Sequence, residues 1–153
     1  LGPEAGSISW DGEALNQDPE GHGARLHYVG HLDAVKPALT VAENLSIWAA
    51  LRTGDRSGVM PALTQFGLDR LAGIPARLLS AGQRRRLALA RIMATPAPLW
   101  LLDEPTVTLD TTSIDLVEGL IAGHRERGGM AVVATHVGLN LPGAAVLDLG
   151  APS

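Results

Sequence analysis

The sequence contains no cysteine, one phenylalanine, one tyrosine and no apolar run long enough to span a membrane. Without cysteine, disulfide bonds and metal sites with thiolate ligands are excluded. Aromatic residues make up 3% of the chain and hydrophobic residues 46%, so the core must be built mainly from aliphatic side chains. The formal net charge of −4 gives no general reason to expect nucleic-acid binding. A length of 153 residues suits one domain of ordinary size.

The predicted elements alternate in the way typical of an α/β protein. Strands are expected at 6–10, 24–30, 98–103, 130–135 and 145–149, and helices at 40–54, 58–66, 80–95 and 111–127. The segments 98–103 and 130–135 are apolar without alternation, which indicates strands buried on both faces of a parallel sheet. Residues 21–25 are expected to form a loop.

The helix expected from Ser80 has a glycine, Gly82, in its first turn. Ser80 and Gln83 have the spacing of a capping box, whereas a glycine here costs about 0.5–1 kcal/mol relative to alanine. A bare backbone at a helix N-terminus lets an anion such as phosphate approach the unpaired N–H groups. The segment therefore predicts either an anion-binding helix start or a capped helix that tolerates a glycine. The arginines at 84–86 are interpreted as a solvated helix face.

Polar residues follow two of the expected strands. Asp103 and Glu104 end the first of these apolar runs, and His136 comes just after the second. In open α/β sheets, ligands bind at the carboxyl ends of the strands. One carboxylate there can hold Mg²⁺ through water, the next can orient an attacking water, and the histidine could reach the same ligand. The alternative interpretation is a solvated acidic loop and an ordinary surface histidine.

These features occur in an order that resembles the ATP-binding subunits of ABC transporters. The signature motif matches "LSAGQ" at 79–83, and the Walker B motif with its catalytic glutamate matches "LWLLDEP" at 99–105. The D-loop matches "TLD" at 108–110, and the switch histidine matches "ATH" at 134–136. The resemblance implies an α/β fold: a P-loop NTPase-like ABC ATPase core, here partial, with a small helical subdomain.

The resemblance also implies catalytic roles for two residues and a metal-binding role for a third. Glu104 would activate the attacking water, and His136 would contact the γ-phosphate of ATP. Asp103 would hold Mg²⁺ through water. Each of these residues lies at one of the two strand ends described above.

Nucleotide-binding roles fall on five further residues. Ser80, Gly82 and Gln83 would form the half of a composite ATP site that meets the γ-phosphate held by a second copy of the subunit, in a head-to-tail dimer. Asp110 would communicate across that dimer. His31 stands where the family usually has the Q-loop glutamine, and its imidazole could touch metal or water.

Several segments resemble one subfamily, the CcmA-type ATPases of haem exporters in cytochrome c maturation. They are the Gly30-His31 pair, Lys36, "LTVAENL" at 39–45 and "APLWLLDEP" at 97–105. We therefore expect residues 1–35 to form the N-terminal strands and Q-loop region, 36–79 the helical subdomain, and 80–153 the remaining core. The implied complex contains integral membrane subunits and no nucleic acid, and lies at the cytoplasmic face of the inner membrane.

One departure from the family concerns the phosphate-binding loop. The chain holds no GxxxxGK[S/T] sequence; in the family this loop lies upstream of a stretch that "PEAGSISWDG" at 3–12 resembles. The chain also opens without methionine, so we expect a fragment that is inactive as an ATPase by itself. Two alternatives stay open: the ATPase of another small exporter (antibiotic, lipid or lipoprotein), and an interaction module that does not hydrolyse ATP. A DNA-repair ATPase is disfavoured, because 31–80 has no room for a long coiled coil.

Overall fold

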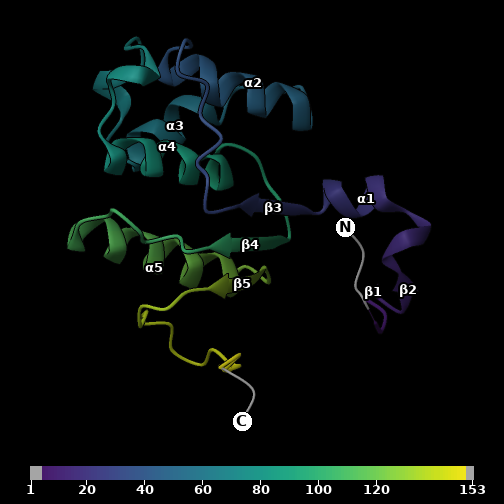
Figure 1. The fold of residues 1–153 in the computed structure, drawn as a ribbon. Coiled ribbons are helices and arrows are strands. Elements are labelled where there is room, and N and C mark those ends of the chain that lie inside the picture. Colours follow the sequence, from purple (N-terminus) through teal and green to yellow (C-terminus); the bar gives the residue numbers. More distant parts are fainter. Residues whose placement is uncertain (1–4, 151–153) are drawn as a thin grey trace.

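A computed structural model describes residues 5–150, which are arranged around a three-stranded parallel sheet (Figure 1). The strands are β3 (Leu26–Val29), β4 (Leu99–Asp103) and β5 (Met130–Ala134), in the spatial order β3-β4-β5. The chain passes through α4 (Ala81–Ala94) before β4 and through α5 (Thr111–Glu126) between β4 and β5. The parallel sheet with helical crossovers confirms the predicted α/β class.

The N-terminal part forms a hairpin and a short helix. β1 (Ser9–Trp10) pairs antiparallel with β2 (Glu13–Ala14), and the Asp11-Gly12 turn between them has positive φ at both positions, +51° and +86°. Residues 3 and 4 of the segment 3–12 lie outside the described residues. A 3₁₀ turn, η1 (Leu15–Gln17), leads into α1 (Pro19–Ala24).

The prediction of a loop at 21–25 is wrong, because α1 extends through most of this segment. Asp18 caps this helix by accepting a hydrogen bond from the Gly21 N–H at 2.9 Å. Pro19 occupies the first helical position, where its fixed φ and missing N–H are favourable. The two glycines within the segment did not prevent a helix of six residues.

Two helices begin with capping boxes, and one of them is the box expected at Ser80 and Gln83. Thr40 and Glu43 exchange hydrogen bonds at the start of α2 (Val41–Thr53), which ends at Gly54 with φ +73°. Ser80 and Gln83 do the same at the start of α4. The helix expected at 58–66 is α3 (Val59–Gln65), and two 3₁₀ turns, η2 (Asp69–Leu71) and η3 (Ala76–Leu78), fill the irregular segment before α4.

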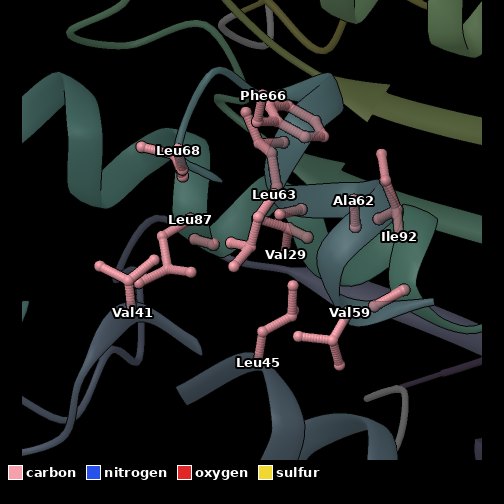
Figure 2. Packing of buried hydrophobic residues seen from close by; sticks show 14 of the residues in the cluster. Val29, Val41, Leu45, Val59, Ala62, Leu63, Phe66, Leu68, Leu87 and Ile92 are labelled. Carbon is pink, nitrogen blue, oxygen red and sulfur yellow. The ribbon is translucent and has the colours of Figure 1, made fainter. Parts of the chain in front are cut away.

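A continuous aliphatic core joins the helices α2, α3 and α4 to one face of the sheet. Figure 2 shows Leu63 and Phe66 of the α3 region facing Leu87 and Ile92 of α4, with Val29 of β3 close by. All of these side chains are almost completely buried. The helix carrying the signature motif therefore shares its hydrophobic contacts with both the helical layer and the sheet.

The expectation that 98–103 and 130–135 are buried on both faces is wrong for the described residues. Along β4, Trp100 and Leu102 are buried, whereas the alternate residues are half-buried. Along β5, Met130 and Val132 are 46% and 60% exposed. Within residues 5–150, the helices cover one face of the sheet, so burial alternates as it does in a one-sided sheet.

The strand expected at 145–149 is also absent from the described part of the chain. Its apolar residues Val146, Leu147 and Leu149 are more than 80% exposed. An extended segment becomes a strand through hydrogen bonds to a neighbour, and none of the described strands provides that neighbour. No helix within residues 5–150 is long and apolar enough to cross a membrane.

One polar side chain lies deep in this core, and it makes stability depend on pH. His27 of β3 is 1% exposed, and its Nε2–H donates to the Thr95 carbonyl oxygen at 2.8 Å. Its Nδ1 is buried with no hydrogen-bond partner among the described residues. Burial, which disfavours the charged form, lowers the pKa of His27 to about 4.

We expect the free energy of unfolding to fall as the pH drops from about 6.5 to 4. In this range His27 binds a proton in the unfolded chain but stays neutral in the native protein. The loss should approach about 3 kcal/mol at the acid end. Denaturant titrations across this pH range measure it, with His27→Gln as the matched variant. Gln retains an N–H donor for Thr95 but does not titrate, so its stability should fall less. Parallel pH profiles for the two proteins would contradict the assignment.

Candidate functional site

The residues that follow β4 and β5 lie side by side at the carboxyl edge of the sheet. The parallel register places Asp103 opposite Ala134. The Glu104 N–H then donates to the Ala134 carbonyl oxygen at 2.8 Å, which extends the pairing one residue beyond β4. Thr135 and His136 come next after Ala134, and they are thereby brought against Glu104.

The Glu104 carboxylate is held by the segment after β5. Its Oε1 accepts hydrogen bonds from the His136 backbone N–H at 3.1 Å and from His136 Nδ1 at 2.8 Å. Its Oε2 accepts the Thr135 hydroxyl at 3.3 Å. The sequence-predicted pair Glu104 and His136 is thus brought into contact, and Thr135, not singled out from the sequence, is added to them. We call these three residues the Glu104 cluster.

The Glu104 cluster keeps the carboxylate ionised. The side-chain hydrogen bond from His136 is the main cause that lowers the pKa of Glu104, with smaller contributions from the charge of His136 and from Thr135. The Glu104 backbone has φ +48°, a left-handed conformation that costs a residue other than glycine about 1–2 kcal/mol. An ionised carboxylate in this fixed position is chemically suited to orient a water molecule and accept its proton.

Asp103 lies next to the Glu104 cluster and offers a different kind of group. Its side chain is half-buried, and among the described residues its carboxylate accepts no hydrogen bond. Within residues 5–150, no group of three or more acidic, histidine or cysteine side chains forms a metal cage. One free carboxylate nevertheless fits the way Mg²⁺ binds with nucleotides, through one or two carboxylates, waters and phosphate oxygens.

The start of α4 presents a capped helix N-terminus. The Ser80 hydroxyl oxygen accepts the Gln83 N–H at 3.2 Å, and Gln83 Oε1 accepts the Ser80 N–H at 2.8 Å. Because the Ser80 hydroxyl only accepts in this pair, its proton is free to donate to an anion. These two side chains make no hydrogen bond to the Glu104 cluster within the described part of the chain.

Gly82 is packed against the loop between β4 and α5. A Cβ atom at Gly82 would lie 2.9 Å from the carbonyl oxygen of Thr108, which is closer than real Cβ atoms come. Thr108 itself has φ +66°, a genuine outlier for a β-branched residue. The glycine is therefore required for a backbone contact inside the chain, in addition to any role with an anion.

Two other predicted residues occupy exposed positions. Asp110 accepts the Ser113 N–H at 2.9 Å and caps α5, and hydrogen bonds from Ser113 lower the pKa of Asp110. His31 is exposed in the loop after β3, and its side chain makes no hydrogen bond to any described residue. The structure does not bring His31 into contact with the Glu104 cluster.

The interpretation of residues 84–86 as a solvated helix face is wrong at its centre. Arg85 is 3% exposed and donates hydrogen bonds to the carbonyl oxygens of Asp103, Glu104 and Pro105. The helical period contained this information, because Arg85 precedes the buried Ala88, Leu89 and Ile92 by three, four and seven positions. Its two neighbours are half-buried: Arg84 donates to Leu79 and Arg86 to Phe66.

Comparison with known proteins shows the family to which the chain belongs. The family model described as "ABC transporter" matches residues 1–107. The cytochrome c biogenesis ATP-binding export protein CcmA of Rhodospirillum rubrum is 57% identical over 149 residues, which are 97% of this chain and 64% of that protein. The protein of the same name from Paramagnetospirillum magneticum is 56% identical, over 97% of this chain and 70% of that protein.

Solved structures show the same fold. A post-hydrolysis dimer of the ATP-binding cassette MJ0796 bound to ADP and Pi superposes with a TM-score of 0.74 at 27% identity, covering 90% of this chain and 65% of that one. The chain thus spans about two thirds of that structure and of the Rhodospirillum rubrum relative. From its motifs, its fold and these similarities, the chain belongs to the ABC transporter family of ATP-binding proteins, where its sequence is similar to the CcmA proteins.

Proposed function

We propose that this chain supplies the water-activating and signature parts of an ATP-hydrolysing subunit in an ABC exporter. The observation that carries the proposal is the contact between Glu104 and His136 across the ends of two parallel strands, at 2.8 Å. An ionised carboxylate fixed at this edge is placed where nucleotides bind in α/β sheets. Family membership makes ATP the nucleotide expected there.

The residues at the strand ends divide the chemistry between them. Asp103 would hold Mg²⁺ through water, and the ion would neutralise charge on the phosphates of ATP. Glu104 orients the attacking water and accepts its proton. His136 holds Glu104 in place through Nδ1, and its exposed ring is available to the γ-phosphate.

The signature end of α4 would act on the ATP of a second copy. Ser80 offers a free hydroxyl donor and Gly82 offers bare backbone. Gln83 stabilises the first turn of the helix through the capping box. Asp110 lies exposed at the start of α5, beside the loop that packs on Gly82. From this position it would communicate with the partner copy across the dimer. We infer a head-to-tail dimer with two composite sites.

We infer an export role in cytochrome c biogenesis from the CcmA relatives, with haem as the cargo. Those relatives are named ATP-binding export proteins of cytochrome c biogenesis, so integral membrane subunits are the partners that fit. The working position is the cytoplasmic face of the inner membrane, with Mg²⁺ and ATP as cofactor and substrate. His31, in the exposed loop after β3, would contribute to the nucleotide site from the side of the helical layer.

The test uses a chimera: the Rhodospirillum rubrum CcmA protein in which the 149 matching residues are replaced by those of this chain. We expect the purified chimera to hydrolyse ATP. In a Rhodospirillum rubrum strain lacking its own protein, the chimera should restore c-type cytochromes, as measured by haem staining of gels. The unmodified relative serves as the positive control.

Each failure has a distinct meaning. A folded chimera that does not hydrolyse ATP, while the relative does, would disprove the catalytic assignment and favour an interaction module. Hydrolysis without recovery of c-type cytochromes would retain the ATPase and disprove the cytochrome role, which favours an exporter of another cargo.

A further inference from the structure

Arg85 is a buried cation whose hydrogen-bonding capacity is fully used. Its side chain is 4% exposed, and all five of its N–H groups point at oxygen atoms. On one side, Nε donates to Pro105 at 3.2 Å, and Nη2 donates to Asp103 at 2.7 Å and to Glu104 at 2.8 Å, each time at the backbone carbonyl. On the other side, Nη1 donates to the Gly30 carbonyl at 2.8 Å and to Asp33 Oδ1 at 3.1 Å.

The first group of contacts fixes the backbone at the catalytic glutamate. Three successive carbonyl oxygens, from Asp103 to Pro105, converge on a single guanidinium. Glu104, the middle residue of the three, is the one with φ +48°. A left-handed residue persists where its surroundings over-determine it, and Arg85 together with the bond from Glu104 N–H to Ala134 provides that constraint.

The second group of contacts reaches the loop after β3, which carries His31. Arg85 holds Gly30 and Asp33 of this loop. A second arginine of the same helix, Arg91, donates to the carbonyl oxygens of Asp33 at 2.6 Å and Ala34 at 2.8 Å. The Arg91 guanidinium also lies 4.9 Å from the ring centre of Trp48 on α2. The loop is thus tied to the helical layer and to Arg85 together.

We propose that Arg85 is a positioning residue. It fixes the position of the Glu104 carboxylate and makes that position depend on the loop 30–34. The inference rests on the proposed function, since it needs Glu104 to activate water. The N–H groups of Arg85 are all directed at oxygen atoms of the chain itself, so Arg85 acts through the backbone of Glu104. A movement of Asp33 withdraws an acceptor from the same guanidinium that holds the Glu104 turn.

The geometry requires an arginine. Five donors in a rigid plane reach two separate backbone segments, whereas a lysine has three donors on one point charge. Arg85→Lys keeps the charge and most of the length but cannot serve all five acceptors. Arg84→Lys is the matched control, because Arg84 lies on the same helix and donates one hydrogen bond, to Leu79 at 2.6 Å.

In the chimera, we expect Arg85→Lys to lower kcat about 100-fold, the loss typical of a catalytic group displaced by about 1 Å. The KM for ATP should stay within about twofold, since uniform substrate binding does not depend on Glu104. Arg84→Lys should leave both values close to those of the chimera. Steady-state ATPase kinetics measure the split between kcat and KM.

Asp33 provides a second test that leaves the buried guanidinium in place. Asp33→Ala removes one of the five acceptors and should lower kcat about tenfold, the scale of one hydrogen bond to a charged group. Asp33→Asn retains an oxygen acceptor and should recover most of that loss. Equal losses for the two Asp33 variants would contradict the role of this contact.

A third measurement separates positioning from folding. In the Glu104→Gln chimera, where the water-activating group is already gone, Arg85→Lys should still allow ATP-dependent dimers in size-exclusion chromatography. Loss of those dimers, or an unchanged kcat for Arg85→Lys alone, overturns the proposal. A chimera that hydrolyses no ATP at all instead overturns the proposed function, so the two failures are distinguishable.

Discussion

Glu104→Gln in the chimera is expected to lower ATP turnover by about 10²–10⁴-fold while ATP-bound dimers accumulate. Gln has the shape of Glu, and its amide oxygen can still accept the His136 backbone N–H that now reaches Oε1. A neutral amide cannot take the proton of an attacking water. The proposed binding surfaces at Ser80 and Gly82 are untouched, so dimers should form and persist, as measured by size-exclusion chromatography with ATP.

Glu126→Gln is the matched control, since Glu126 is exposed at the end of α5 and makes no ion pair within the described residues. It should hydrolyse ATP at the rate of the chimera. Near-normal turnover by the Glu104→Gln variant would show that Glu104 is not the catalytic group. The hydrogen bond between Glu104 and His136 would then be purely structural.

Features decided within a few residues were predictable from the sequence. Ser80 and Gln83 form their capping box, and the Asp11-Gly12 turn has the positive φ angles typical of a two-residue hairpin turn. In each case the interacting groups lie within four positions, so local spacing determines the geometry. The same holds for Asp110, whose side chain caps α5 by accepting the N–H of Ser113, three positions away.

Features that depend on distant segments were less accessible. The sequence predicts that Glu104 and His136 lie near each other, because each follows the end of a strand in a parallel sheet. The left-handed backbone of Glu104 and the five acceptors of Arg85 could not be anticipated, since these acceptors lie in two segments, 30–33 and 103–105, that are distant in sequence from Arg85. The helical period is compatible with Arg85 on the apolar face of α4, but its charge led to the prediction of a solvated position. Its burial is possible because five oxygen acceptors pair with the guanidinium.

The exposure of the sheet illustrates a different limit. An apolar run such as 130–135 shows that a strand has hydrophobic side chains on both faces, but not what covers them. In residues 5–150, the helices α2, α3, α4 and α5 pack on one continuous core that includes Trp100 and Leu102. Val132 is left 60% exposed. The sequence pattern shows which side chains are apolar, and the arrangement of neighbouring elements determines whether those side chains are buried.

Gly82→Asp in the chimera is expected to abolish ATP-dependent dimerisation while each monomer still binds ATP. The signature end of α4 would meet only the γ-phosphate bound by the other copy, so the remaining contacts to the nucleotide are unaffected. A carboxylate about 4 Å from a phosphate charge costs about 4 kcal/mol at an effective dielectric constant of about 20, roughly a thousandfold in affinity. Size-exclusion chromatography and binding of a fluorescent ATP analogue measure the two effects.

Two further substitutions identify the cause of the loss. Gly119→Asp makes the same chemical change on α5, where a Cβ meets no atom within 4 Å, and dimerisation should be retained. Gly82→Ala adds the Cβ that would press on the Thr108 carbonyl but brings no charge, so it should weaken dimerisation less than Gly82→Asp. If the Ala and Asp variants lose dimerisation equally, displacement of Thr108 within the subunit is the cause, and repulsion of phosphate is excluded. If both dimerise like the chimera, Gly82 has no part in the composite site.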